Sequence, residues 1–223
     1  MQIKFESIDA IIFDLDDCLV DERIWIKERW EKTIQHVEER NGLVGFGENF
    51  WKVFDKRGRH YKGHVDETLE KCGGDPELVG EIVSFFLKQK TTEEPFPGVV
   101  DFLEEASKRF RLGIITNGRE EIQMDRIERM GIIDYFSSIV CAFEFPKPGL
   151  KPYLKGIEEL GVGSSRSIYV SHDQQDFNGA KLAGMNTVYV NMFNAEHMEN
   201  VDIEVSSFSE LLSLIRSDDE SGK

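Results

Sequence analysis

The feature that most constrains the fold is a series of short apolar runs, each stopped by polar residues. The first is 9–14, which ends in Asp14, and similar runs follow at 111–116, 138–142, 167–170 and 187–190. Short, continuous apolar runs of this kind are typical of strands that are buried on both faces of a parallel sheet. These five segments therefore predict the strands of one sheet.

Segments with helical patterns separate the predicted strands. Residues 119–130, 153–160 and 179–183 are each followed by a glycine, which is a suitable C-terminal stop for a helix. Alternation of strand and helix favours an α/β fold with a mostly parallel, Rossmann-like sheet.

The stretch 21–94 does not fit this alternation, because it shows helical stripes without convincing strands. Pro95 and the pair Pro97-Gly98 mark the return to the strand-and-helix pattern. We interpret 21–94 as an all-helical insertion, and 1–20 with 95–223 as the α/β core.

Composition narrows the function classes. The 223 residues are 40% hydrophobic and 31% charged, with a net charge of −15, so the surface should repel nucleic acid and acidic membranes. An anionic substrate stays possible where a bound cation and local basic groups reverse the potential inside a cleft. Three widely spaced cysteines, no apolar run near ~20 residues and no secretory signal favour a cytoplasmic protein.

Two carboxylates follow the first predicted strand, at the end where parallel sheets usually bind ligands. Asp14 and Asp16 are two residues apart, so one carboxylate can be a nucleophile and metal ligand while the other handles protons. A solvated acidic turn would have the same sequence, so this motif is moderate evidence by itself.

Three further segments carry polar groups at the ends of predicted strands. Thr116 and Asn117 offer a hydroxyl and backbone N–H groups to a phosphate, and Lys147 lies between two prolines, where it could neutralise a phosphate or the nucleophile. Asp173 and Asp176 could complete an oxygen-rich Mg²⁺ site with Asp14. Each segment is a weak signal alone, whereas the four in this order are a strong one.

In these motifs the sequence resembles the haloacid dehalogenase-like superfamily, specifically the phosphoglycolate-phosphatase-like hydrolases with a helical cap. The resemblance covers essentially the whole chain. It is carried by the four motifs and by the segments 96–99, 116–131, 147–162 and 176–185.

The resemblance implies a Mg²⁺-dependent phosphatase that acts on a small phosphorylated metabolite through an aspartyl-phosphate. Asp14 would be the nucleophile and a metal ligand, and Asp16 the general acid and base. Thr116 and Asn117 would bind the phosphate and Lys147 would be the motif lysine. Asp14, Asp16, Asp173 and Asp176 make up the expected metal site. Dehalogenases of the superfamily lack the second aspartate, so Asp16 favours a phosphatase.

One departure from the family pattern concerns the fourth strand, which ends in Ser171-His172 where relatives have Gly-Asp. Either Asp173 binds the metal, or His172 occupies that place and Asp176 carries more of the site; a structural role for His172 is an equal alternative. Two rival functions share the fold: a phosphosugar mutase that returns the phosphate to a sugar, and a catalytically weak metabolite-binding protein.

Overall fold

The protein is described here by a computed structural model that covers residues 3–59, 61–193 and 195–221. The chain divides into two compact units, a core unit of Met1–Glu22 with Glu93–Lys223 and a helical unit of Arg23–Thr92. The insertion expected from the sequence, 21–94, extends two residues beyond the helical unit at each end. None of the described helices is long and apolar enough to cross a bilayer.

The described part of the core unit contains a six-stranded sheet in which every neighbouring pair is parallel. The strand order is β3-β2-β1-β4-β5-β6. The strands are β1 (Ala10–Phe13), β2 (Arg111–Thr116), β3 (Ser138–Cys141), β4 (Ser167–Ser171), β5 (Asn186–Val190) and β6 (Ile203–Val205). The predicted α/β fold is confirmed, and all five predicted strands are present. The sixth, β6, was not predicted.

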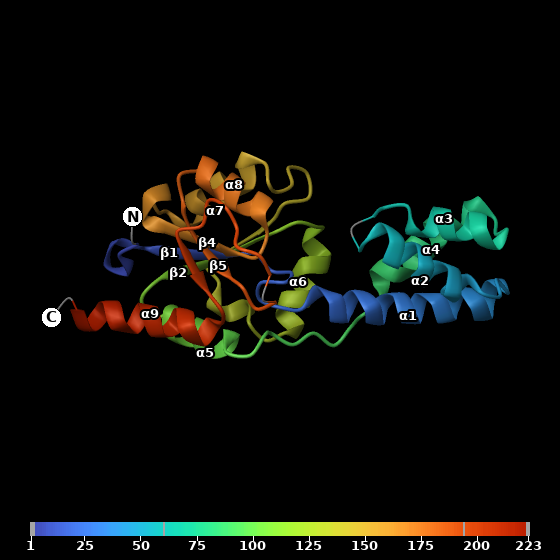
Figure 1. The fold of residues 1–223 in the computed structure, drawn as a ribbon, viewed down its shortest axis with the longest axis horizontal. Helices are drawn as coiled ribbons and strands as arrows, with labels where there is room; N and C mark the ends of the chain where they lie inside the picture. The colour runs from blue at the N-terminus through green and yellow to red at the C-terminus, as the bar shows by residue number, and fades with distance from the viewer. Residues whose placement is uncertain (1–2, 60, 194, 222–223) are drawn as a thin grey trace. The chain divides into compact units, whose positions relative to one another are not determined.

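Helices cover both faces of this sheet (Figure 1). They are α5 (Val99–Ala106), α6 (Glu120–Arg129), α7 (Leu150–Leu160), α8 (Gln174–Leu182) and α9 (Phe208–Ser221). Alternate residues of β1 point to opposite faces. Phe13 therefore packs with α5 and α9, whereas Ile12 packs with α7 and α8. Because β1 is buried along its whole length between β2 and β4, its carboxyl end is a fixed position at the centre of the sheet.

The start predicted for α8 was wrong. The sequence suggested a helix over 179–183, but α8 begins at Gln174, because the Asp173 side chain caps its N-terminus by accepting from the Gln175 N–H at 2.7 Å. Asp176 therefore lies in the first turn of a helix and not in a loop.

The helical unit has its own apolar core. Its helices are α1, which begins at the last core residue (Glu22–Asn41), α2 (Phe46–Arg57), α3 (His64–Cys72) and α4 (Val79–Lys88). Trp30 lies at the centre of an aromatic cluster, stacked on Phe86 with ring centroids 4.1 Å apart and packed against Phe50 at 4.3 Å. Asp75 caps the short 3₁₀ turn that leads into α4.

Candidate active site

Asp14 directly follows β1 and is held by the sheet. Its N–H donates to the Val170 carbonyl of β4 at 2.9 Å, which extends the strand ladder by one residue. Its carboxylate oxygen Oδ1 accepts from the Leu15 N–H at 2.7 Å and from Lys147 Nζ at 2.6 Å. Burial raises the pKa of Asp14 to about 8, the charges of Asp176 and Asp16 add to this rise, and Lys147 opposes it. The first predicted site residue is therefore a buried carboxylate paired with the predicted lysine.

Lys147 lies between two buried carboxylates. Its ammonium is 2.6 Å from Asp14 Oδ1 and 2.6 Å from Asp176 Oδ2. Burial alone would lower the pKa of Lys147, but the two carboxylates outweigh it and hold the pKa above its ordinary value. One ammonium is thus shared by two carboxyl groups, so ionisation of Asp14 sets two negative charges against one positive charge.

Asp176 is the most completely bonded of the predicted site residues. Its Oδ2 accepts from Lys147, from the Tyr169 hydroxyl at 3.0 Å and from Ser171 Oγ at 3.1 Å, and its Oδ1 accepts from the Tyr153 hydroxyl at 3.3 Å. Burial would raise the pKa of Asp176, but Lys147 and these hydrogen bonds lower it. Asp176 is therefore ionised, and it fixes the position of the lysine.

Asn117 holds the backbone of Lys147. Its Oδ1 accepts from the Lys147 N–H at 2.8 Å and its Nδ2 donates to the Lys147 carbonyl at 3.3 Å. The side-chain amide is thus bonded to the loop that carries the lysine, and phosphate binding by Asn117 stays a prediction.

The hydroxyl of Thr116 is buried at the carboxyl end of β2. Gln123 Nε2 donates to Thr116 Oγ1 at 2.9 Å and to the Asn117 carbonyl at 2.8 Å. The hydroxyl itself donates a long hydrogen bond to the Asn117 carbonyl at 3.4 Å, a bond that a ligand oxygen could replace. Thr116 can therefore donate to a ligand oxygen.

Asp16 and Asp173 are hydrogen-bonded to partners outside the Asp14–Lys147–Asp176 group, although the charge of Asp16 still acts on Asp14. The Asp16 carboxylate, 23% exposed, pairs with Arg126 of α6, and the exposed Asp173 caps α8. Among the described residues, no three acidic, histidine or cysteine side chains gather where they could hold a metal ion.

His172 lies beside Asp14. Its Nδ1 is 4.0 Å from Asp14 Oδ2 and its Nε2 is 3.7 Å from Asp17 Oδ2. Burial lowers the pKa of His172, although the charge of Asp17 opposes this, and Nδ1 is buried without a hydrogen bond within the described residues. Asp17 also caps α1 by accepting from the Glu22 N–H at 2.9 Å. The sequence did not decide the role of His172; in the structure its imidazole faces Oδ2 of Asp14.

Several site residues were missed by the sequence reasoning. The hydroxyls that bind Asp176 come from strand β4 and helix α7, where tyrosine and serine look like ordinary core residues. Gln123 and Arg126 had a readable signal, because polar residues three apart on the helix that follows Thr116-Asn117-Gly118 share one face. The missed residues are Gln123, Arg126, Tyr153, Tyr169 and Ser171.

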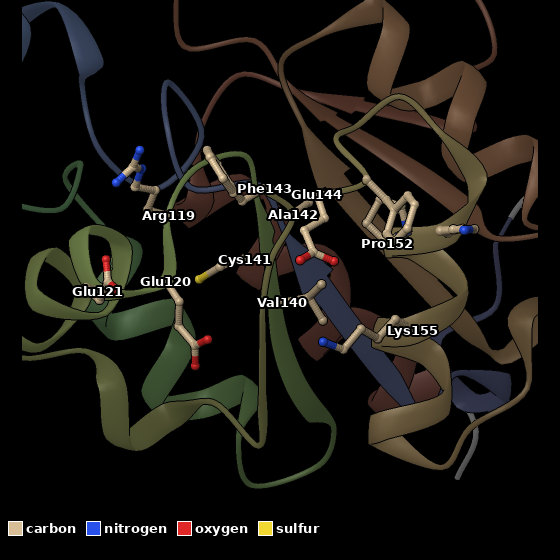
Figure 2. A pocket seen from close by; sticks show the side chains of 12 residues that line it. Arg119, Glu120, Glu121, Val140, Cys141, Ala142, Phe143, Glu144, Pro152 and Lys155 are labelled. Atoms are coloured by element: carbon tan, nitrogen blue, oxygen red, sulfur yellow. The ribbon is translucent and has the colours of Figure 1, made fainter. Parts of the chain in front are cut away.

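A hollow of about 560 Å³ opens beside β3 (Figure 2). In Figure 2, Glu120 of α6 and Lys155 of α7 lie on either side of Val140 and Cys141. Its walls carry charges of both signs, and none of the predicted catalytic residues lines it. It is lined by Arg119, Glu120, Glu121, Val140, Cys141, Ala142, Phe143, Glu144, Phe145, Lys151, Pro152 and Lys155.

Comparisons with known proteins identify a family and several similar proteins. The model of the family described as haloacid dehalogenase-like hydrolase matches residues 11–190. A glyceraldehyde 3-phosphate phosphatase from Methanopyrus kandleri is 27% identical over 227 residues, covering 94% of this chain and 97% of that protein. The pyrimidine 5'-nucleotidase YjjG of Escherichia coli is 32% identical over 159 residues, covering 69% and 70%.

A solved structure extends the comparison. The crystal structure of a 2-haloacid dehalogenase from Pseudomonas syringae pv. Tomato matches with a TM-score of 0.69 at 26% identity, covering 94% of this chain and 99% of that one. The similar proteins therefore include phosphatases and a dehalogenase, and the site residues have to separate the two reactions.

Proposed function

We propose that this chain, which belongs to the haloacid dehalogenase-like hydrolase family and is a phosphohydrolase, uses Asp14 as the nucleophile against a small phosphorylated metabolite. The observation that carries the proposal is the position of Asp14. It lies at the carboxyl end of the central strand, with Lys147 at 2.6 Å and a second carboxylate, Asp16, two residues later. The chain matches the glyceraldehyde 3-phosphate phosphatase from Methanopyrus kandleri over 97% of that protein's length.

Asp16 supports a phosphatase over a dehalogenase. An alkoxide leaving group needs a proton, whereas a halide leaves without one, so only the first reaction requires an acid beside the nucleophile. Asp14 would attack phosphorus as Asp16 protonates the departing oxygen. Water, deprotonated by Asp16, would then attack the same phosphorus and release phosphate and free Asp14.

The other residues would bind and neutralise the transferring group. Lys147 is held by Asp176 and by Asn117, so its charge is fixed beside the reacting oxygens without reorganisation. The Thr116 hydroxyl, oriented by Gln123, would donate to a phosphate oxygen.

Mg²⁺ is the cofactor that we propose. The donor set fits a hard cation, because carboxylate oxygens are its preferred ligands and two buried carboxyl groups share a single ammonium. Lys147 contacts Oδ1 of Asp14, so Oδ2 is the oxygen that we propose for the cation. Asp14 and the Asp16 carbonyl would hold the ion, together with a ligand from 172–173. When bound, it would neutralise charge on the phosphoryl oxygens.

The helical unit Arg23–Thr92 is proposed as the cap domain that selects the substrate. The class that we favour is a short alkyl phosphate, in line with the relative from Methanopyrus kandleri that is named a glyceraldehyde 3-phosphate phosphatase.

The test is phosphate release from a panel of glyceraldehyde 3-phosphate, phosphoglycolate, phosphoserine and a pyrimidine 5'-nucleotide, with Mg²⁺ or EDTA. We expect release that requires Mg²⁺, that is fastest for one alkyl phosphate, and that is lost in Asp14→Asn. Chloride release from 2-chloropropionate serves as the dehalogenase control. Chloride release without phosphate release would overturn the proposal, and retention of a sugar bisphosphate would support a mutase.

A further inference from the structure

Arg126 binds both carboxylate oxygens of Asp16. Its Nη2 donates to Asp16 Oδ1 at 2.5 Å and its Nη1 donates to Oδ2 at 3.1 Å. The Arg126 side chain is only 1% exposed, whereas Asp16 is 23% exposed. A guanidinium that binds a carboxylate through two parallel hydrogen bonds fixes the plane of that carboxylate as well as its position.

Arg126 is itself held by two other side chains. Its Nε donates to Oε2 of Glu93 at 2.7 Å, and that carboxylate is 1% exposed. Its Nη1 also donates to Gln123 Oε1 at 2.8 Å. Since Gln123 donates to Thr116 Oγ1, one face of α6 joins the proposed acid and base to the proposed phosphate-binding hydroxyl.

A buried ion pair of this kind is a weak source of stability, because taking both charges out of water costs much of what their attraction returns. Arg126 is therefore better explained by what it holds. We infer that Arg126 is a positioning residue, which holds the Asp16 carboxylate where it can exchange a proton with the leaving oxygen. The inference rests on the proposed function, and it assigns a role to a residue outside the proposed nucleophile, lysine and phosphate-binding residues.

The substitution Arg126→Lys tests the inference. Lysine keeps the positive charge beside Glu93 and Asp16 but cannot bind both carboxylate oxygens in one plane. A misplaced acid should slow cleavage of an alkyl phosphate, because its alkoxide leaving group needs a proton. Cleavage of p-nitrophenyl phosphate should hardly change, because nitrophenolate departs without a proton. We expect kcat/KM for glyceraldehyde 3-phosphate to fall about 100-fold, and that for p-nitrophenyl phosphate to fall less than about threefold.

Arg129→Lys is the matched control. Arg129 lies on the same helix and contacts the same Glu93, at 3.6 Å, but its Nε is bonded to Asp125. We expect kcat/KM to stay within about twofold of wild type for both substrates. Glu93→Gln is a second test, because it loosens the guanidinium without removing it, and it should reproduce the selective loss in weaker form. The unfolding temperature of every variant is measured in parallel.

The outcomes separate the inference from the proposed function. An equal loss on both substrates, or no loss on either, in a folded Arg126→Lys protein overturns the positioning role and leaves the phosphatase intact. If Arg126→Lys does not fold, the same two outcomes in Glu93→Gln decide the question. If wild type releases no phosphate from either substrate, or Asp14→Asn retains full activity, the proposed function fails and the inference falls with it.

Discussion

At the scale of single residues, the site depends on which hydrogen bonds are already made before a substrate arrives. Thr116 accepts from Gln123, and this leaves its hydroxyl hydrogen to be donated. Asp176 accepts from four side chains and so cannot turn toward the substrate. These hydrogen bonds fix the orientation of each group before substrate binds, which is the condition for electrostatic preorganisation.

Thr116→Val removes this hydroxyl at nearly constant volume, so we expect a selective loss of phosphate binding. A hydrogen bond to a charged group contributes about 1.5–3 kcal/mol, which corresponds to a loss of about 10- to 100-fold in kcat/KM. Thr116→Ser keeps the donor and should stay within about fivefold of wild type. Steady-state kinetics on the best panel substrate makes the comparison; equal activity of the valine and serine variants would contradict the assigned role.

Lys147→Met leaves Asp14 and Asp176 buried without their shared positive charge. Breaking a buried pair by removing one partner costs about 3–5 kcal/mol, so both activity and the unfolding temperature should fall. The double substitution Lys147→Met with Asp176→Asn removes one of the two unpaired charges. We expect it to recover stability but not activity. Thermal unfolding and phosphate release are measured on both variants; an active single variant would show that the ammonium is dispensable.

At the scale of secondary structure, close packing between α7 and α8 positions Asp176. A Cβ added at Gly179 would lie 2.5 Å from Tyr153 Cε2 and 2.6 Å from the Pro148 carbonyl, a backbone atom that cannot move cheaply. Tyr153 donates to Asp176, and Pro148 follows Lys147, so a shift of either one disturbs the site.

Gly179→Ala should therefore lower stability by about 1–3 kcal/mol and reduce kcat as well. The matched control is Gly80→Ala in α4, where an added Cβ meets nothing within 4 Å. That change should stabilise the helical unit by about 0.5–1 kcal/mol and leave kcat unchanged. Urea unfolding followed by circular dichroism, with kinetics at saturating substrate, compares the two. Similar effects of both substitutions would argue against close packing at Gly179.

The helical unit has a titratable group in its own core. Burial lowers the pKa of His64 from its ordinary value of 6.5, although its hydrogen bond to the Gly58 carbonyl and the charge of Glu67 oppose this. The unfolded chain then binds the proton at a higher pH than the folded chain does. The stability that His64 contributes is thus present above pH 6.5 and is lost as the pH falls toward the lowered pKa.

The unfolding midpoint of this unit should consequently be lower at pH 5.5 than at pH 7.5. All three tryptophans of the chain, Trp25, Trp30 and Trp51, belong to the helical unit, so their fluorescence reports its unfolding specifically. His64→Phe should remove most of the difference between the two pH values. A midpoint in wild type that does not change with pH would contradict the effect of burial on His64.

At the scale of the whole molecule, the sequence predicted what depends on local pattern. Apolar runs such as 9–14 and 111–116 could be recognised as strands because they are buried on both faces, and their order with the helices was enough to predict the α/β fold. The strand β6 was missed because its residues Ile203–Val205 alternate between apolar and acidic over only three positions. The start of α8 was missed because a side-chain cap at Asp173, not an apolar stripe, determines it.

The site was predictable as a set of residues but not as a set of contacts. Asp14, Lys147 and Asp176 could be named from the motifs, but the sharing of one ammonium between two carboxylates depends on three segments far apart in the sequence meeting. Arg126 could be noticed on its helix but not as the partner of Asp16, because it lies 110 positions away in the sequence and only the fold brings the two together. Long-range pairing of charges leaves no local pattern to read.

The central claim is that Asp14 becomes phosphorylated during turnover, and the most direct measurement is the mass of its peptide. Asp16→Asn should slow hydrolysis of the phosphoryl-enzyme, so that acid quenching after mixing with p-nitrophenyl phosphate and Mg²⁺ traps it. We predict one phosphoryl group on the peptide that contains Asp14, and none after the further substitution Asp14→Asn. A phosphoryl group on any other residue, or phosphate release without a labelled peptide, would contradict the account.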